Sequence, residues 1–188
     1  QGNILSDEGG ILYLAYNGTT TIAVVPVVGG EQNTDETFTV ESPIAFDNMS
    51  VIYAHGENQI LVARRGVGNN YYIGTFEGED VTFGAVLNTP GKTASNGGAI
   101  FKLKGKDYLA YPSGTGYFDG FSVVNLETGD VVAEHKETKA TANGFQSNWV
   151  IAEEVNENSV YIYQYFPGAT GNSYIAKYLL GEPIPDPY

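Results

Sequence analysis

The sequence predicts an all-β protein built from four copies of one antiparallel meander. Pairs of short apolar runs recur about every fifty residues along the 188-residue chain, a period typical of repeated β-sheet units. The chain is rich in Val, Ile and Thr, and its 14 tyrosines, nine phenylalanines and 24 glycines suit short strands joined by tight turns. No stretch of the chain shows the apolar period of an amphipathic helix.

The second unit shows the expected order of strands most clearly. We expect strand A over Val51–His55 and strand B over Gln59–Arg64, with a short Gly-Glu-Asn turn between them. Strand C is expected over Tyr71–Phe76, and an acidic Gly-containing turn leads into strand D over Val81–Val86. Two strands joined by such a turn form a hairpin, and four in sequence form a meander.

The other units follow the same order with two departures. In the first unit strand A is expected over Gly2–Ser6, and the connection between strands C and D is longer. The fourth unit ends after a strand C at Tyr174–Leu180, because the three prolines in 181–187 cannot donate hydrogen bonds to a β-ladder. The four units are predicted over residues 1-47, 48-95, 96-146 and 147-188.

Meanders that stack face to face around an axis form the blades of a β-propeller, and the period favours this architecture. The segment Phe121–Val132, with its Leu-Glu-Thr-Gly turn at 126-129, resembles the strand C, turn and strand D of propeller repeats. The acidic composition rich in Tyr, Asn and Gly is similar to that of uncharacterised secreted or surface propellers of gut bacteria. This resemblance implies an extracellular, cell-surface or periplasmic protein.

The incomplete fourth unit predicts that the four blades do not close a ring alone. An open stack exposes apolar blade faces, which need a cover. We expect this cover to come from the rest of a larger parent propeller or from a second copy of the chain.

Composition excludes several classes of partner. The net charge of −13 argues against nucleic acids and anionic membrane surfaces, which attract clustered Lys and Arg. No apolar run approaches the roughly 18 residues of a membrane-spanning segment. The absence of cysteine excludes disulfides, thiolate metal sites and a cysteine nucleophile. Any signal segment would lie upstream of Gln1.

Loop lengths predict which edge of the blades binds a ligand. The A–B turns are minimal, whereas the B–C and D–A connections are long and should leave from one edge, because strand direction alternates. Aromatic rings stack on sugars, and charged or amide groups bond hydroxyls. The candidate binding residues on this edge are Arg64, Arg65, Tyr111, Tyr117, Phe118, Asp119, Trp149 and Tyr165.

An asparagine also recurs just before each predicted strand A, and Asn48, Asn96 and Asn148 belong to this series. In a propeller, strand A lines the central channel, so the resemblance implies a polar ring at the mouth of the channel. Repeated turn chemistry is the alternative explanation, because asparagine adopts left-handed turn conformations.

The sequence contains no motif for catalysis, a metal or a cofactor. His55 and His135 are the only histidines and fall at unrelated positions of the blade. No calcium-loop motif is present, although carboxylates from separate loops leave a calcium site open. The expected function is therefore a non-catalytic module that binds a glycan or a protein on the long-loop edge. One alternative is a glycoside hydrolase or lyase that uses Asp119 and Asp47, and another is a small-ligand β-barrel carrier.

Overall fold

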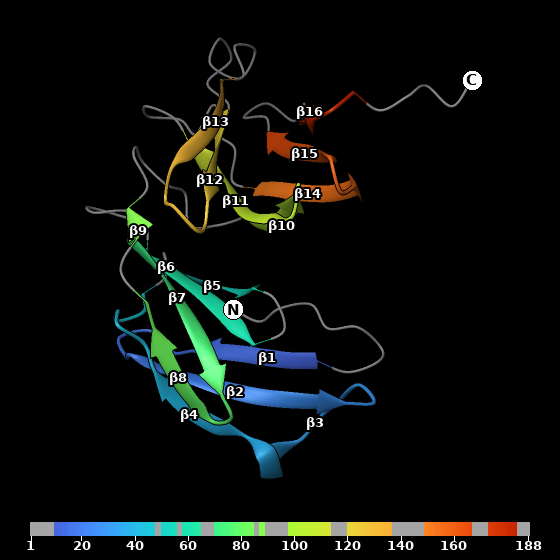
Figure 1. Ribbon diagram of the computed structural model, residues 1–188. Helices are drawn as coiled ribbons and strands as arrows, with labels where there is room; N and C mark the ends of the chain where they lie inside the picture. The colour runs from blue at the N-terminus through green and yellow to red at the C-terminus, as the bar shows by residue number, and fades with distance from the viewer. Residues whose placement is uncertain are drawn as a thin grey trace. The chain divides into compact units, whose positions relative to one another are not determined.

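The computed structural model describes residues 10–47, 50–55, 58–64, 70–84, 87–88, 98–113, 120–136, 149–166 and 173–183. These ranges contain sixteen strands and one 3-10 helix, Thr34–Glu36, and no α-helix (Figure 1). The strands belong to four separate antiparallel sheets. The all-β class and four antiparallel sheets are therefore confirmed, whereas closure into a propeller ring stays a prediction.

Contacts divide the chain into two compact units, each with two of the sheets. Unit 1 contains sheet I, with β1 (Gly10–Ala15), β2 (Thr21–Val28), β3 (Glu31–Gln32) and β4 (Phe38–Glu41), and sheet II, with β5 (Ser50–His55), β6 (Gln59–Arg64), β7 (Asn70–Glu77) and β8 (Asp80–Phe83). The short β9 (Leu87–Asn88) comes next in the chain and belongs to unit 2. Unit 2 contains sheet III, with β10 (Ala99–Leu103), β11 (Lys106–Ser113), β12 (Gly120–Asn125) and β13 (Val131–Lys136), and sheet IV, with β14 (Trp149–Asn156), β15 (Ser159–Phe166) and β16 (Tyr174–Gly181).

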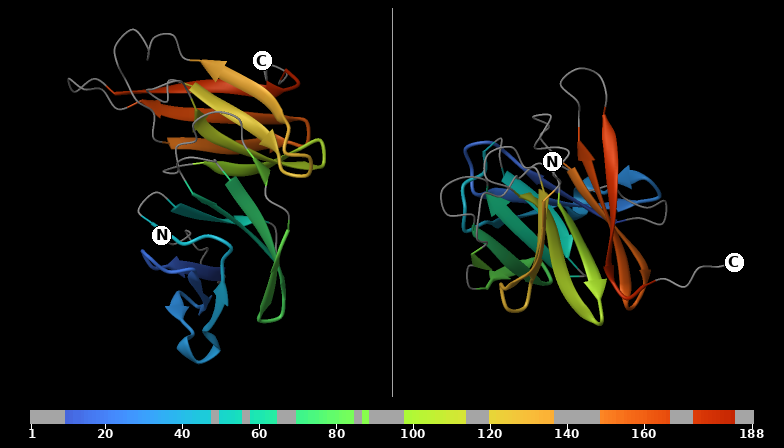
Figure 2. Two further views of the ribbon diagram at one scale, coloured as in Figure 1. Left: turned by 90° about the vertical axis from the view of Figure 1, so that its left-hand side faces the viewer. Right: turned by 90° about the horizontal axis from the view of Figure 1, so that it is seen from above.

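Strands that are consecutive in the chain pair with each other along sheets II, III and IV, as a meander requires. In sheet I, β4 pairs with β2 rather than with β3. Figure 2 shows β10–β13 and β14–β16 as such series. The second unit of the sequence was predicted well, since the strands expected over Val51–His55 and Gln59–Arg64 are β5 and β6. No helix that could cross a bilayer occurs within the described ranges.

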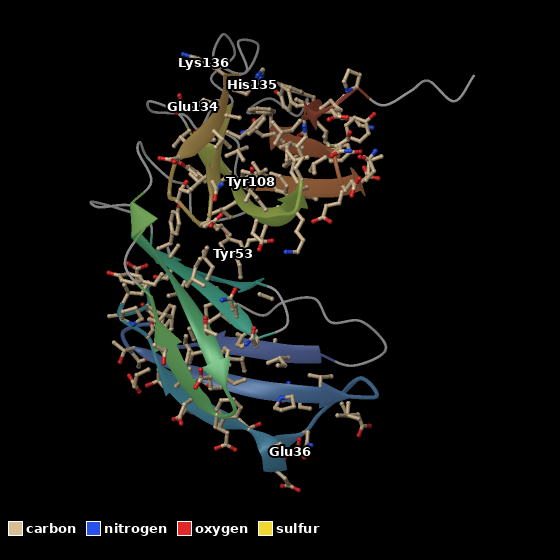
Figure 3. All side chains as sticks on the ribbon, viewed as in Figure 1. Glu36, Tyr53, Tyr108, Glu134, His135 and Lys136 are labelled. Carbon is tan, nitrogen blue, oxygen red and sulfur yellow. The ribbon has the colours of Figure 1, made fainter. Side chains whose placement is uncertain are left out.

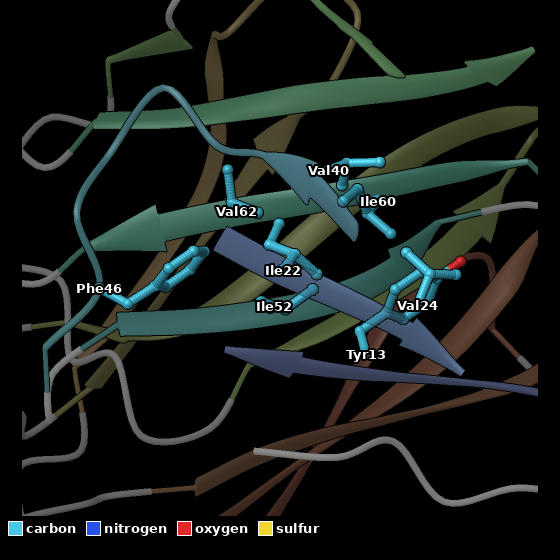
Figure 4. Close-up of a cluster of buried hydrophobic side chains, with 8 residues drawn as sticks. All are labelled: Tyr13, Ile22, Val24, Val40, Phe46, Ile52, Ile60 and Val62. Atoms are coloured by element: carbon cyan, nitrogen blue, oxygen red, sulfur yellow. The ribbon is translucent and has the colours of Figure 1, made fainter. Parts of the chain in front are cut away.

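Unit 1 buries its core between two sheets. Ile22 and Val24 from β2 meet Ile60 and Val62 from β6, with Phe46 from the loop after β4 beside them (Figure 4). Alternation along each strand places these residues on the facing sides of sheets I and II. Burying a side chain of this size stabilises the fold by about 1.5–3 kcal/mol relative to leaving it exposed.

Unit 2 repeats this arrangement with sheets III and IV. Phe121 and Val123 from β12 pack in one cluster with Val160 and Ile162 from β15. The Leu-Glu-Thr-Gly turn between β12 and β13 also matches the prediction. Asn125 Oδ1 accepts a hydrogen bond from the amide of Glu127 at 2.8 Å, as in the turns that asparagine nucleates.

Candidate functional site

The register of unit 2 places the long connections at one edge of each sheet. Ser113 at the end of β11 lies opposite Gly120 at the start of β12, and Gly120 lies opposite Lys136 at the end of β13. In sheet IV, Trp149 lies opposite Tyr165, and Tyr165 lies opposite Ile175. The B–C and D–A connections of these sheets therefore share an edge, as expected from alternating strand direction.

Few of the predicted binding side chains belong to the part of the chain that the structure describes. Seven residues lie outside the described ranges: Arg65, Tyr117, Phe118, Asp119, Asn48, Asn96 and Asn148. The backbone places Arg64 at the end of β6 and Trp149 at the start of β14, and their side chains are not described. Tyr111 in β11 is only 3% exposed, whereas Tyr165 is 38% exposed. We therefore leave Tyr111 out of the candidate site and build it around Tyr165.

Tyr165 belongs to a face of sheet IV that points away from the core of unit 2, which we call the outer face. Val160 and Ile162 face the core, so alternation places Tyr161, Tyr163 and Tyr165 on the other side of β15. Residues directly opposite each other in a sheet share a face. The outer face consists of Ile151, Glu153, Tyr161, Tyr163, Tyr165, Ile175, Lys177 and Leu179.

Polar contacts hold the three tyrosines of the outer face. The Tyr163 hydroxyl donates a hydrogen bond to the Glu153 carboxylate, and the Tyr165 hydroxyl donates one to Ser173 Oγ at 3.2 Å. Lys177 Nζ lies 3.5 Å from the centroid of the Tyr161 ring and 5.3 Å from that of Tyr163. An ammonium group over an aromatic ring is attracted by the negative face of the ring.

The same neighbours act on the Lys177 ammonium group. The hydrogen bond with Tyr163 is the main cause that raises the pKa of Lys177 above its ordinary value. The charges of Tyr163, Tyr161 and Glu153 raise this pKa further, while desolvation opposes the shift. Lys177 therefore stays positively charged through the neutral pH range and balances Glu153 on the outer face.

Exposed apolar side chains flank the tyrosines. Ile151 on β14 is 59% exposed, and on β16 Ile175 is 65% and Leu179 is 43% exposed. Large exposed apolar groups that gather on one face are typical of a surface that contacts a ligand or another protein. The outer face thus combines aromatic rings, aliphatic groups and one balanced pair of charges.

The sequence analysis selected Tyr165 but missed Tyr161, Tyr163, Glu153 and Lys177. The alternation Tyr161-Ile162-Tyr163-Gln164-Tyr165 was the available signal, because a period of two puts all three tyrosines on one face of a strand. Which face stays exposed depends on the packing of sheet III, and the sequence does not reveal that choice.

Buried polar groups lie near the long-loop edge of unit 2, on the side of the sheets that faces its core. Gln164 is 0% exposed and donates from Nε2 to the carbonyl oxygen of Gly120 at 2.5 Å. His135, labelled at the end of β13 in Figure 3, lies against Tyr178 and Phe121, with ring centroids 4.0 and 5.6 Å apart. Gln164 Oε1 and His135 Nε2 are buried, and neither atom has a hydrogen-bond partner among the described residues. Within those residues no group of three His, Asp or Glu is placed to hold a metal.

No protein-family model matches the chain, and no curated protein matches it. Among solved structures, the chain is similar to the crystal structure of a DUF4623 family protein from Bacteroides eggerthii, with a TM-score of 0.54 and 11% sequence identity. The similarity covers 92% of this chain and 44% of that chain, so this chain spans less than half the length of its neighbour. At this identity the likeness concerns the all-β fold alone, and the neighbour comes from a gut bacterium.

Proposed function

We propose that this chain is a non-catalytic glycan-binding module of an extracellular, cell-surface or periplasmic protein, and that the tyrosines of the outer face are its platform. The row of Tyr161, Tyr163 and Tyr165 on one strand is the observation that carries this proposal. Side chains two residues apart on a strand are separated by about 7 Å. The platform therefore suits an extended saccharide that runs along β15.

The chemistry of the platform matches both surfaces of a sugar. Tyrosine rings offer apolar faces to the C–H groups of a pyranose, and hydroxyls, carboxylates and ammonium groups bond its hydroxyls. Glu153, Ser173 and Lys177 supply the polar groups around the rings. Because these contacts already hold Tyr163 and Tyr165, little side-chain entropy is lost on binding.

The Tyr165 end of the platform lies at the long-loop edge, where Trp149 stands opposite Tyr165. This end supports the expectation of a ligand at that edge, while Tyr161 lies toward the short turn between β14 and β15. The localisation rests on the resemblance to secreted propellers, and the similar chain from a gut bacterium is compatible with it.

Affinity electrophoresis and calorimetry with soluble β-glucan, xylan, galactomannan and chitooligosaccharides test the proposal. We expect at least one of these glycans to bind without the release of reducing ends. Tyr165→Ala should weaken that binding about fivefold to tenfold, since a lost aromatic stack costs about 1–1.5 kcal/mol. Tyr16→Ala is the matched control, because Tyr16 is 60% exposed and lies outside sheet IV.

Three results would contradict the proposal. The first is that none of the glycans binds. The second is that Tyr165→Ala and Tyr16→Ala weaken binding equally, and the third is that the bound glycan is cleaved. The third result would favour the alternative enzyme with a carboxylate pair. The carrier alternative requires one barrel, whereas the described strands form four separate sheets.

A further inference from the structure

The side chain of Lys177 lies on the tyrosine platform of the outer face. Lys177 on β16 stands opposite Tyr163 on β15, and its side chain extends diagonally toward Tyr161. Its Nζ atom is 3.5 Å from the centroid of the Tyr161 ring and 5.3 Å from that of the Tyr163 ring. A long side chain can reach the diagonal neighbour of an adjacent strand in this way. The ammonium group therefore takes a place where a sugar would otherwise stack.

The three tyrosines of the platform are not equally open. Tyr161 and Tyr163, whose ring centroids are 6.2 Å apart, are half-buried, whereas Tyr165 is exposed. In the part of the chain that the structure describes, no cation lies over the Tyr165 ring. A C–H group packs against a ring at about 3.5–4.0 Å between carbon atoms, and Lys177 Nζ already fills this space on one face of Tyr161. A sugar can thus stack freely on Tyr165 but not on the covered face of Tyr161.

The contacts that hold Lys177 are weak enough for a ligand to break them. Among the described residues Lys177 belongs to no ion pair, and the Glu153 carboxylate attracts it from beyond ion-pair distance. An exposed cation–π contact shifts an equilibrium by only about twofold to fivefold. An aromatic stack is worth about as much for each ring. A saccharide that stacks on both Tyr161 and Tyr163 therefore gains more than the displacement of the ammonium group costs.

We propose that Lys177 limits how strongly the outer face prefers a long glycan over a short one, an inference that rests on the proposed function. In the free chain the ammonium group covers the Tyr161 and Tyr163 end of the platform, so a short saccharide binds at Tyr165 alone. A long saccharide displaces the ammonium group and stacks along the whole row, whose ends lie about 13 Å apart. Lys177 is thus a residue that determines specificity for chain length.

Calorimetry with disaccharides and hexasaccharides of the cello-, xylo-, manno- and chito- series tests the proposal. Lys177→Ala should bind a hexasaccharide about threefold more tightly than the wild type, because the covered rings become open. Its affinity for the disaccharide should not change. Lys177 is exposed, so the replacement should leave the fold intact.

Two control variants separate the covering of the rings from the loss of a charge. Lys177→Arg keeps a cation that stacks on aromatic rings, and it should bind both lengths as the wild type does. Lys106→Ala removes the same charge from β11 of sheet III, and it should also bind like the wild type.

NMR tests the covered state in the absence of glycan. A group held over an aromatic ring experiences the ring current, so the Hε protons of Lys177 in the free wild type should resonate upfield of those of Lys106. A hexasaccharide should move the Lys177 signals back toward the ordinary position, and a disaccharide should leave them unchanged.

Three results would overturn the inference. The first is that the Lys177 protons of the free chain resonate at the ordinary position. The second is that the hexasaccharide affinity of Lys177→Ala does not rise, or rises no more than its disaccharide affinity. Either of these results leaves the proposed glycan binding intact. The third is that no oligosaccharide binds to the wild type or to Lys177→Ala, which removes the proposed function together with this inference.

Discussion

Gln164 on β15 donates a hydrogen bond from Nε2 to the carbonyl oxygen of Gly120 on β12, at 2.5 Å and across the two sheets of unit 2. The side chain is 0% exposed, and the bond joins residues 44 positions apart in the chain. A buried amide that reaches a carbonyl of another sheet holds the two sheets in one relative position. Gly120 and Gln164 both lie near the long-loop edge of unit 2.

We expect Gln164→Ala to destabilise the fold by about 2–4 kcal/mol, because it leaves a cavity and removes the donor to the Gly120 carbonyl. Gln164→Met keeps most of the volume and also removes the unpartnered Oε1, so its cost should be only about 1 kcal/mol. Urea denaturation of both variants measures the difference. Equal losses would show that packing contributes little at this position.

Gly120→Ala should be among the most damaging substitutions. A Cβ at this position would lie 1.8 Å from the carbonyl oxygen of His135 and 2.9 Å from its carbonyl carbon, and these backbone atoms belong to the paired strand β13. We expect a loss above about 3 kcal/mol, or failure to fold. Gly84→Ala is the control, because the nearest atom is 3.7 Å from its Cβ, and it should change stability by less than about 0.5 kcal/mol.

The turn between β10 and β11 has two residues with positive φ, Lys104 at 53° and Gly105 at 73°. Such turns prefer asparagine followed by glycine. Lys104→Asn should therefore raise stability by about 0.5 kcal/mol, whereas Gly105→Ala should lower it by about 1 kcal/mol.

Thermal unfolding in 1 M salt is the suitable measurement for this turn. The exposed ion pair of Lys104 with Glu182, 3.0 Å apart, is then screened in the wild type. A lower midpoint for Lys104→Asn than for the wild type under these conditions would contradict the explanation from turn conformation.

The titration of Lys177 should depend on Tyr163. The hydrogen bond with Tyr163 is the main cause that raises the pKa of Lys177 in the folded chain. The stabilisation that charged Lys177 gives the folded chain is therefore fully present below the unfolded pKa of about 10.4. That contribution is lost as pH rises through the folded pKa.

Tyr163→Phe should bring the Lys177 pKa back toward its ordinary value, and NMR titration of the lysine side-chain carbons would report the change. Tyr165→Phe should leave the titration as it is, because Tyr165 is not among the groups that shift it. An unchanged Lys177 midpoint in Tyr163→Phe would show that another group raises the pKa.

Local features made the hairpins predictable. The turn at Lys104 and Gly105, and the Leu-Glu-Thr-Gly turn after Asn125, depend on residues close in sequence, whose backbone preferences act before any tertiary contact forms. Alternating strand direction also predicts that Trp149 and Tyr165 share an edge, and their direct pairing agrees. The same argument could not show that Tyr111 is buried, because both faces of β11 carry apolar side chains.

By itself the sequence determined the all-β class and most strands and turns of four antiparallel sheets, because these depend on short-range backbone preference and on alternation with a period of two. The tertiary structure decided which face of each strand is covered. Tyr161, Tyr163 and Tyr165 form a row on the outer face, with Tyr165 exposed and the other two half-buried, because Val160, Ile162 and Gln164 turn toward sheet III. A shift of one residue in the pairing would reverse the two faces, so the packing of sheet against sheet, which joins residues far apart in the chain, selects the binding surface.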